Sequence, residues 1–102
     1  MVDPDLAWAA GLFEGEGCIS KANKESVRLD LAMHERDIDI LKKFRRVMNR
    51  GKLYGPYKNN MIFWLVFGRE ISCSVLLDLW PYLGERRKRR AIDFYPRMSE
   101  LS

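Results

Sequence analysis

Two pairs of strand-like segments, separated by an amphipathic helix, constrain the fold of this chain more than any other feature of its sequence. The strand patterns cover residues 18–21, 27–34, 52–57 and 61–67, joined by polar turns at 22–25 and 58–60. Because two hairpins of this kind readily share one sheet, we predict an α+β fold with a four-stranded antiparallel sheet. Residues 61–67 are apolar throughout, so periodicity does not say which face of that strand is buried.

Helical patterns occupy most of the remaining chain, over residues 5 to about 14, 38–49, 71–80 and 85–95. Asp3 can cap the first helix, and Gly15-Glu16-Gly17 should end it. Pro81 and Pro96 end the last two helices. We therefore expect the order αββαββα with an extra C-terminal helix, and helices on one face of the sheet. At 102 residues the chain is predicted to be a single domain, 1–102.

The distribution of charge indicates which kind of molecule this protein binds. The net charge is +4, and it lies in the second half of the chain, where five basic residues run together at 86–90. Such a cluster favours a polyanion, nucleic acid first, although a solvated helix face has the same composition. The open face of the predicted sheet offers cations, hydrogen-bonding groups and an aromatic ring, so it is either a DNA-binding surface or an ordinary solvated face. Its candidate DNA-binding residues are Arg28, Asp30, His34, Lys52, Tyr54 and Lys58.

Several classes of protein are disfavoured. No apolar run approaches the roughly 20 residues of a spanning helix, and the N-terminus lacks the basic start of a signal peptide. We therefore expect an intracellular protein (in the cytoplasm or nucleoid, or in an organelle) that has no membrane partner and is not secreted. Cys18 and Cys73 are then reduced thiols, and with His34 they are too few for a structural zinc site. We also expect no small-molecule cofactor.

The first helix carries an unusual stripe of small residues. Ala7, Gly11 and Gly15 recur every four residues, although each interior glycine costs about 1 kcal/mol of helix stability relative to alanine. A stripe of this kind permits close approach of another backbone. That backbone is either the same helix of a second copy, around a two-fold axis, or the chain's own sheet.

Two acids, Glu14 and Glu16, follow at the end of this helix, where the helix dipole already disfavours negative charge. If two copies meet there, up to four carboxylates converge and need cations to stay ionised. Oxygen ligands suit Mg²⁺, and a metal beside a polyanion-binding surface indicates metal-assisted phosphodiester hydrolysis. The alternative is an exposed Glu-Gly-Glu turn without a function.

The segment Ala9-Ala-Gly-Leu-Phe-Glu-Gly-Glu-Gly17 resembles the LAGLIDADG motif of homing endonucleases, with Ala9 in place of the leading leucine and glutamates in place of both aspartates. Leu79-Trp-Pro-Tyr-Leu83, followed by basic residues, resembles the family's Leu-x-Pro-x-Leu segment. The resemblance implies a single-motif member that acts as a homodimer. Its sheets would form a saddle over a long, imperfectly palindromic DNA duplex.

The resemblance also implies roles for individual residues. The dimer interface would contain Ala7, Gly11, Leu12 and Gly15. Glu16 would be the catalytic acid that binds Mg²⁺ (or Mn²⁺), with Gly15 as a further metal ligand, whereas Glu14 matches a less directly catalytic acid. Arg86 would assist catalysis, with Lys88 as its competitor, and Asp37 would lie near the attacking water unless it only caps a helix. The basic run would contact phosphates through Arg87, Lys88 and Arg90.

The sequence thus predicts a homodimeric, site-specific and Mg²⁺-dependent DNA endonuclease. Three alternatives stay open: a DNA-binding protein of the same fold with weak or no cleavage, an RNA-binding intron maturase, and a basic interaction module whose acids have no role. His34 is a possible general base, although a lone histidine at a strand end more often lies at the surface or caps a turn.

Overall fold

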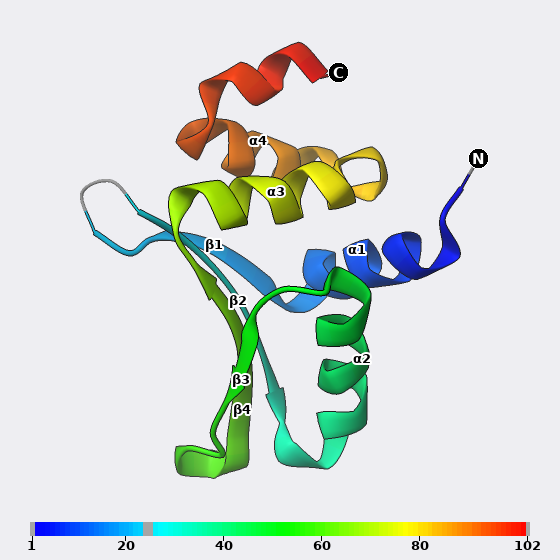
Figure 1. Ribbon diagram of the computed structural model, residues 1–102, viewed down its shortest axis with the longest axis vertical. Coiled ribbons are helices and arrows are strands. Elements are labelled where there is room, and N and C mark those ends of the chain that lie inside the picture. The colour runs from blue at the N-terminus through cyan, green and yellow to red at the C-terminus, as the bar shows by residue number, and fades with distance from the viewer. Residues whose placement is uncertain (1, 24–25, 102) are drawn as a thin grey trace.

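The computed structural model describes residues 2–23 and 26–101, so part of the predicted 22–25 turn lies outside the described residues. Its centre is an antiparallel sheet of four strands: β1 (Gly17–Lys21), β2 (Val27–His34), β3 (Lys52–Tyr54) and β4 (Met61–Phe67). The strand order is β1-β2-β4-β3, which places β2 and β4 in the middle. The predicted α+β fold with two hairpins in one sheet is therefore confirmed. Figure 1 shows the strands curving as they cross the molecule.

The helices α1 (Pro4–Glu16), α2 (Ile38–Met48) and α3 (Arg69–Leu79) pack on one face of this sheet, and α4 (Glu85–Phe94) follows α3. A final 3-10 segment, Pro96–Leu101, packs on α4. The hydroxyl of Tyr95 donates to the carbonyl of Arg69 at 2.7 Å and so ties the end of α4 to the start of α3. Burial of this side chain raises the pKa of Tyr95 to about 12.

The core lies between the sheet and the helices. Trp64 of β4 is fully buried, and its ring meets Phe44 of α2 edge to face, with the ring centroids 4.8 Å apart. The indole N–H of Trp64 donates to the carbonyl of Arg50 at 2.8 Å, which satisfies the one polar atom of that side chain. From α1, Ala9, Ala10 and Phe13 face the core.

The pairing register decides which face of each strand is buried. Leu31 of β2 lies opposite Trp64 of β4, so alternate residues of both strands point into the core. On β4 these are Ile62, Trp64 and Val66, which leaves Met61, Phe63, Leu65 and Phe67 on the open face. The sequence could not make this choice, because every residue of the strand is apolar.

Several element ends differ from the prediction: α3, for example, begins at Arg69 and not at residue 71. Helix α1 runs to Glu16 instead of ending near Glu14, because the turn comes at Gly17, whose N–H donates to the carbonyl of Phe13. A Cβ on Gly17 would lie 2.3 Å from the ring of Phe13, so only glycine fits there. Strand β3 is shorter than predicted and ends at Tyr54, because the chain turns at Gly55, where φ is +111°.

Candidate nucleic-acid interface and metal site

The end of α1 separates the two acids that the sequence places side by side. Because the helix continues to Glu16, residues 14 and 16 are two positions apart on a helix and point to different sides. Glu16 is exposed, whereas Glu14 is half-buried against the start of α4. The carboxylate Oε1 of Glu14 accepts a hydrogen bond from the N–H of Gly84 at 2.7 Å. Glu14 therefore holds two parts of the chain together, and Glu16 is the acid available for a ligand.

The Leu79–Leu83 segment and the following Gly84 pack along α1 and contact both ends of the motif helix. The N–H of Asp3 donates to the hydroxyl of Tyr82 at 2.9 Å near the helix start, where the Asp3 carboxylate caps the helix as predicted. At the other end, Gly84 donates to Glu14, as described above. The two segments that carry the family resemblance therefore pack against each other, 70 residues apart in sequence.

The basic run 86–90 is divided by the periodicity of α4. Arg87 donates from Nη2 and Nε to the carbonyl of Glu14, at 3.0 and 3.3 Å. It thereby places positive charge at the C-terminal end of α1, where the helix dipole is negative. Arg90 donates to the carbonyl of Ile19 at 3.2 Å, and the Lys88 ammonium lies 5.5 Å from the ring centre of Trp80. Arg86 and Arg89 are exposed, as is Arg90 despite its bond to Ile19.

Arg87 is thus the basic side chain that reaches the end of the motif helix, whereas the sequence assigned the catalytic role to Arg86 on its position after the Leu-x-Pro-x-Leu segment. Composition could not distinguish five adjacent basic residues. The contact depends on the angle at which α4 leaves Gly84, which no local pattern encodes. Arg86 lies in the same turn of α4 and remains a candidate for phosphate contact.

The small-residue stripe of α1 faces away from the chain's own core. Gly11 and Gly15 are exposed, and a Cβ built on either would meet no described atom within 4 Å beyond its own helix. The interpretation that these glycines let the helix sit close to its own sheet is therefore wrong. Ala7, the first member of the stripe, and Leu12, beside it, are half-buried.

Four of the candidate DNA-binding residues, Arg28, Asp30, Lys52 and Tyr54, share the open face of the sheet, as predicted. Arg28 and Asp30 alternate with buried residues along β2, and the Nε of Arg28 lies 3.0 Å from the Oδ2 of Asp30. Through β4, Lys52 is in register with Asp30, and Tyr54 with Ala32. Lys58 lies in the turn between β3 and β4 and is exposed. Cys18, which the sequence did not single out for this face, is exposed opposite Asp30.

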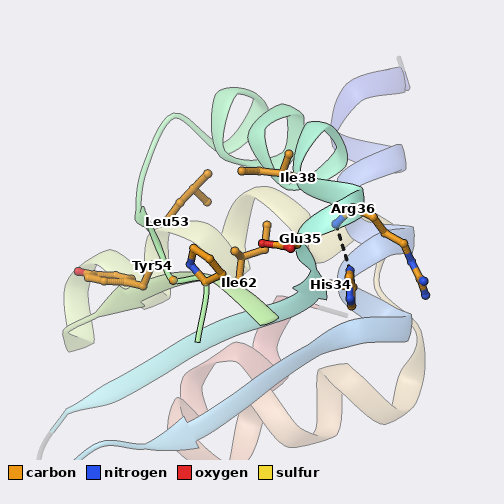
Figure 2. Close-up of a pocket in the computed structure, with 9 residues that line it drawn as sticks. His34, Glu35, Arg36, Ile38, Leu53, Tyr54 and Ile62 are labelled. Atoms are coloured by element: carbon orange, nitrogen blue, oxygen red, sulfur yellow. Dashed lines mark hydrogen bonds between the residues drawn. The ribbon is translucent and has the colours of Figure 1, made fainter. Parts of the chain in front are cut away.

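His34 and Asp37 occupy the junction between β2 and α2. The Nδ1 of His34 accepts a hydrogen bond from the N–H of Arg36 at 3.1 Å, so His34 caps the short 3-10 turn (Figure 2). Asp37 makes no side-chain capping bond, so the prediction that it caps α2 is wrong. Its side chain is half-buried, and its proposed place near an attacking water stays a prediction.

A pocket of about 450 Å³ opens beside this junction, between the ends of β2, β3 and β4 and the start of α2. Figure 2 shows Ile38, Leu53 and Ile62 around it, while the side chains of His34 and Arg36 point away from these apolar residues. The lining is mostly apolar, although Glu35 also borders the pocket, and it contains neither of the acids of the motif helix. We therefore place the candidate chemistry at the end of α1 and not in this pocket.

One chain has few side chains that are placed to bind a metal ion. Among residues 2–23 and 26–101, no cluster of three or more His, Cys, Asp or Glu side chains is placed to hold an ion. The exposed Glu16 carboxylate and the nearby main-chain carbonyl of Gly15 are hard oxygen ligands, which suit Mg²⁺. The described part of one chain therefore offers too few such ligands to hold an ion by itself. Within the described residues, no helix is both long enough and apolar enough to span a bilayer.

Similarity to known proteins is found in the structure and not in the sequence. No family model and no curated protein sequence matches the chain. The structure is similar to the homing endonuclease I-CvuI, solved in complex with its target in the presence of Ca, with a TM-score of 0.74 and 22% identity over 88% of this chain. The chain spans 63% of the length of I-CvuI.

Two further solved structures show the same similarity. The homing endonuclease I-TnaI has a TM-score of 0.71 and 19% identity, covering 99% of this chain and 80% of its own. The LAGLIDADG meganuclease I-AabMI, bound to uncleaved DNA, has a TM-score of 0.68 and 21% identity, covering 88% of this chain and 33% of its own. The Gly-Leu-x-x-Gly stripe of α1, the sheet order and these matches together show that the chain has the fold of the LAGLIDADG homing endonucleases.

Proposed function

We propose that this protein is a homodimeric, site-specific endonuclease that hydrolyses phosphodiester bonds of duplex DNA with Mg²⁺ or Mn²⁺. One observation carries the proposal: the exposed Glu16 carboxylate ends a helix whose exposed side is a bare stripe of glycine. The three solved neighbours described above are homing endonucleases or meganucleases, and two of them are complexes with a target or with DNA. Their fold supports DNA cleavage as the activity. The proposed dimer and metal site are argued from residues of this chain.

Dimerisation would complete the site. Two α1 helices can approach closely where Gly11 and Gly15 leave no side chain between them. A two-fold axis along this contact would bring Glu16 from each of two chains to the same place, because both helices end there. Leu12, at the edge of the stripe, would add apolar contact area across the axis.

Glu16 and the carbonyl of Gly15 would hold the divalent ion, which offsets phosphate charge and lowers the pKa of a bound water. Arg87 offsets the negative end of α1 through its bonds to Glu14, so the acidic end of the motif helix tolerates a DNA strand nearby. Arg86, exposed in the first turn of α4, would contact phosphate and stabilise charge that develops there. We assign Asp37 the orientation of the attacking water.

The open sheet face would lie in the major groove, where a β-ribbon fits. Arg28, Lys52 and Lys58 provide positive charge on that face and at its end. Lys88 and Arg90 already make contacts within the chain, so we expect Arg86 and Arg89 to contribute more of the phosphate binding from α4. Phosphate contacts set register, and the sheet face selects bases.

The test is cleavage of a randomised duplex library by the full chain, with Mg²⁺ and with Ca²⁺. Glu16→Gln should reduce cleavage by roughly a hundredfold or more while DNA affinity stays within about twofold, because a neutral amide is a poor ligand for a hard cation. Glu14→Gln is the matched control, since its amide oxygen still accepts from Gly84 and cleavage should persist. Cleavage that survives Glu16→Gln unchanged would refute the assignment.

One observation favours a second candidate function, DNA binding with weak or no cleavage. Because Glu14 is bonded to Gly84, each chain offers one free acid at the end of α1. Tight duplex binding without product under any divalent ion would support this candidate. Preference for structured RNA over duplex DNA would indicate a maturase, and a monomer without nucleic-acid affinity would indicate a basic interaction module.

A further inference from the structure

The open face of the sheet has an apolar centre. Four side chains of β4 line it, and we call them the β4 row: Met61, Phe63, Leu65 and Phe67. The first three are half-buried, and Phe67 is 55% exposed. Tyr54 and Tyr57 extend the apolar surface beside β3, with the rings of Tyr57 and Phe63 5.8 Å apart between centroids. A hollow of about 400 Å³ opens among them, lined by Arg28, Tyr54, Tyr57, Phe63 and Leu65.

This composition departs from what a solvated sheet face requires. Antiparallel strands with one wet face alternate apolar and polar residues, as β2 does with Arg28 and Asp30. The neighbouring β4 has no polar side chain on either face. A contiguous apolar surface left exposed on an otherwise charged chain marks a contact site.

Charge around the row indicates what covers it. Arg28 lies opposite Phe67, Lys52 lies opposite Leu65, and Lys58 follows in the adjoining turn. An apolar centre flanked by cations matches a DNA groove, in which phosphates flank the base edges. The thymine C5-methyl is the apolar group that base pairs present in the major groove. Stacking on unpaired bases fits less well, because Met61 and Leu65 have no ring to stack.

Building on the proposed function, we propose that the β4 row recognises thymine methyl groups and selects half-sites with thymines at the positions facing β4. Phe63 and Leu65, at the centre of the sheet, would contact the methyl groups most closely, and Phe67 would reach the next base step along the groove. Arg28, whose Nε is held by Asp30, would contact a neighbouring base or phosphate with its remaining N–H groups. The row would thereby determine specificity without hydrogen bonds.

The experiment separates methyl recognition from binding as such. The full chain selects duplexes from a randomised library in Ca²⁺, and the winning duplex is remade with deoxyuridine in place of thymidine, which removes only the methyl groups. We expect enrichment of thymine in each half-site. We also expect roughly three- to fivefold weaker binding for each recognised methyl group that is removed.

Variants locate the effect on the protein. Phe67→Thr and Leu65→Thr introduce a β-branched residue, which strands favour, at half-buried or exposed positions, so the fold should survive. Each should weaken binding to the thymidine duplex and reduce the difference between thymidine and deoxyuridine duplexes. Leu77→Thr is the control, because this 45% exposed leucine lies on α3, away from the sheet's open face. It should retain the full difference.

The outcomes distinguish this inference from the function on which it rests. A selected duplex that binds equally well with deoxyuridine, or selection of half-sites without thymine, would overturn the role of the β4 row and leave the proposed endonuclease intact. Absence of any selected duplex, or preference for single-stranded or structured RNA, would overturn both.

Discussion

At the scale of single residues, the most informative comparison is between Glu14 and Glu16. They are separated by one glycine in the sequence, yet one is a structural acceptor and the other is exposed. The reason is helical geometry, because two positions along a helix turn the side chain through roughly 200°. The continuation of α1 to Glu16 therefore decides which acid can meet a metal ion.

A residue-scale prediction follows from the bond between Glu14 and Gly84. Glu14→Ala removes the acceptor of the Gly84 N–H and should lower the free energy of unfolding by about 1 kcal/mol. Glu14→Gln keeps an acceptor oxygen and should lose less than half of that. Urea unfolding followed by circular dichroism measures both. Equal losses for the two variants would show that charge, and not the hydrogen bond, carries the contact.

At the scale of elements, α1 has two faces with different tasks. Ala9, Ala10 and Phe13 pack into the core, and Gly11 and Gly15 leave the opposite side without side chains. The helix end is bounded by Gly17, where the ring of Phe13 excludes any Cβ. Glycines within one short segment therefore have two roles. Gly17 allows the turn against the Phe13 ring, and Gly11 and Gly15 leave room for another helix to approach α1.

At this scale we predict that alanine at Gly11 and alanine at Gly17 affect stability and self-association differently. Gly11→Ala should leave the isolated chain as stable or up to about 1 kcal/mol more stable, because alanine favours helix and meets no described atom. The same variant should weaken self-association at least tenfold, since the methyl group separates the paired helices. Sedimentation equilibrium measures association, and urea unfolding at low concentration measures stability.

Gly17→Ala is the control for that experiment. Its Cβ would clash with the Phe13 ring, so it should lower the free energy of unfolding by about 1–3 kcal/mol. If Gly11→Ala leaves self-association unchanged, the exposed stripe is not the dimer contact, and the two Glu16 carboxylates do not meet there.

At the scale of the whole molecule, positive charge lies on several surfaces, including that of α2. The proposed complex uses two of them: the open sheet face, with Arg28, Lys52 and Lys58, and the exposed side of α4, with Arg86 and Arg89. The net charge of +4 is modest. The placement of these cations therefore matters more for binding a polyanion than their total. Binding through phosphates releases counterions and so weakens steeply with salt.

The whole-molecule prediction uses that salt dependence. Replacing Arg86 and Arg89 together by glutamine should reduce the slope of log K against log salt by about 3–4 in a dimer, at roughly 0.9 for each phosphate that is no longer neutralised. Fluorescence anisotropy with a labelled duplex between about 50 and 200 mM salt, the range in which phosphate binding dominates, measures the slope. Arg97→Gln is the control, because Arg97 lies in the final 3-10 segment and pairs with Glu100. An unchanged slope for the double variant would show that Arg86 and Arg89 of α4 do not contact DNA phosphates.

Much of this architecture was predictable because it depends on local patterns. Alternation along residues 27–34 predicted β2 and its two faces, and the apolar stripe of 38–49 predicted α2. The glycine stripe and the acids after it indicated the motif helix and its resemblance. Predictions at element ends were weaker: β3 stops at Tyr54 because of backbone geometry at Gly55, which no hydrophobic pattern records.

The sequence by itself determined the fold class, the order of elements and the segment that carries the candidate chemistry, because each follows from hydrophobic periodicity and residue spacing within a few turns of chain. Only the tertiary structure decided which acid is free, which basic residue reaches the motif helix and which face of β4 is open. Those choices depend on contacts such as Glu14 with Gly84 and on strand register, and such contacts join residues that are distant in sequence. Their energies come from packing in three dimensions, so no local pattern can specify them.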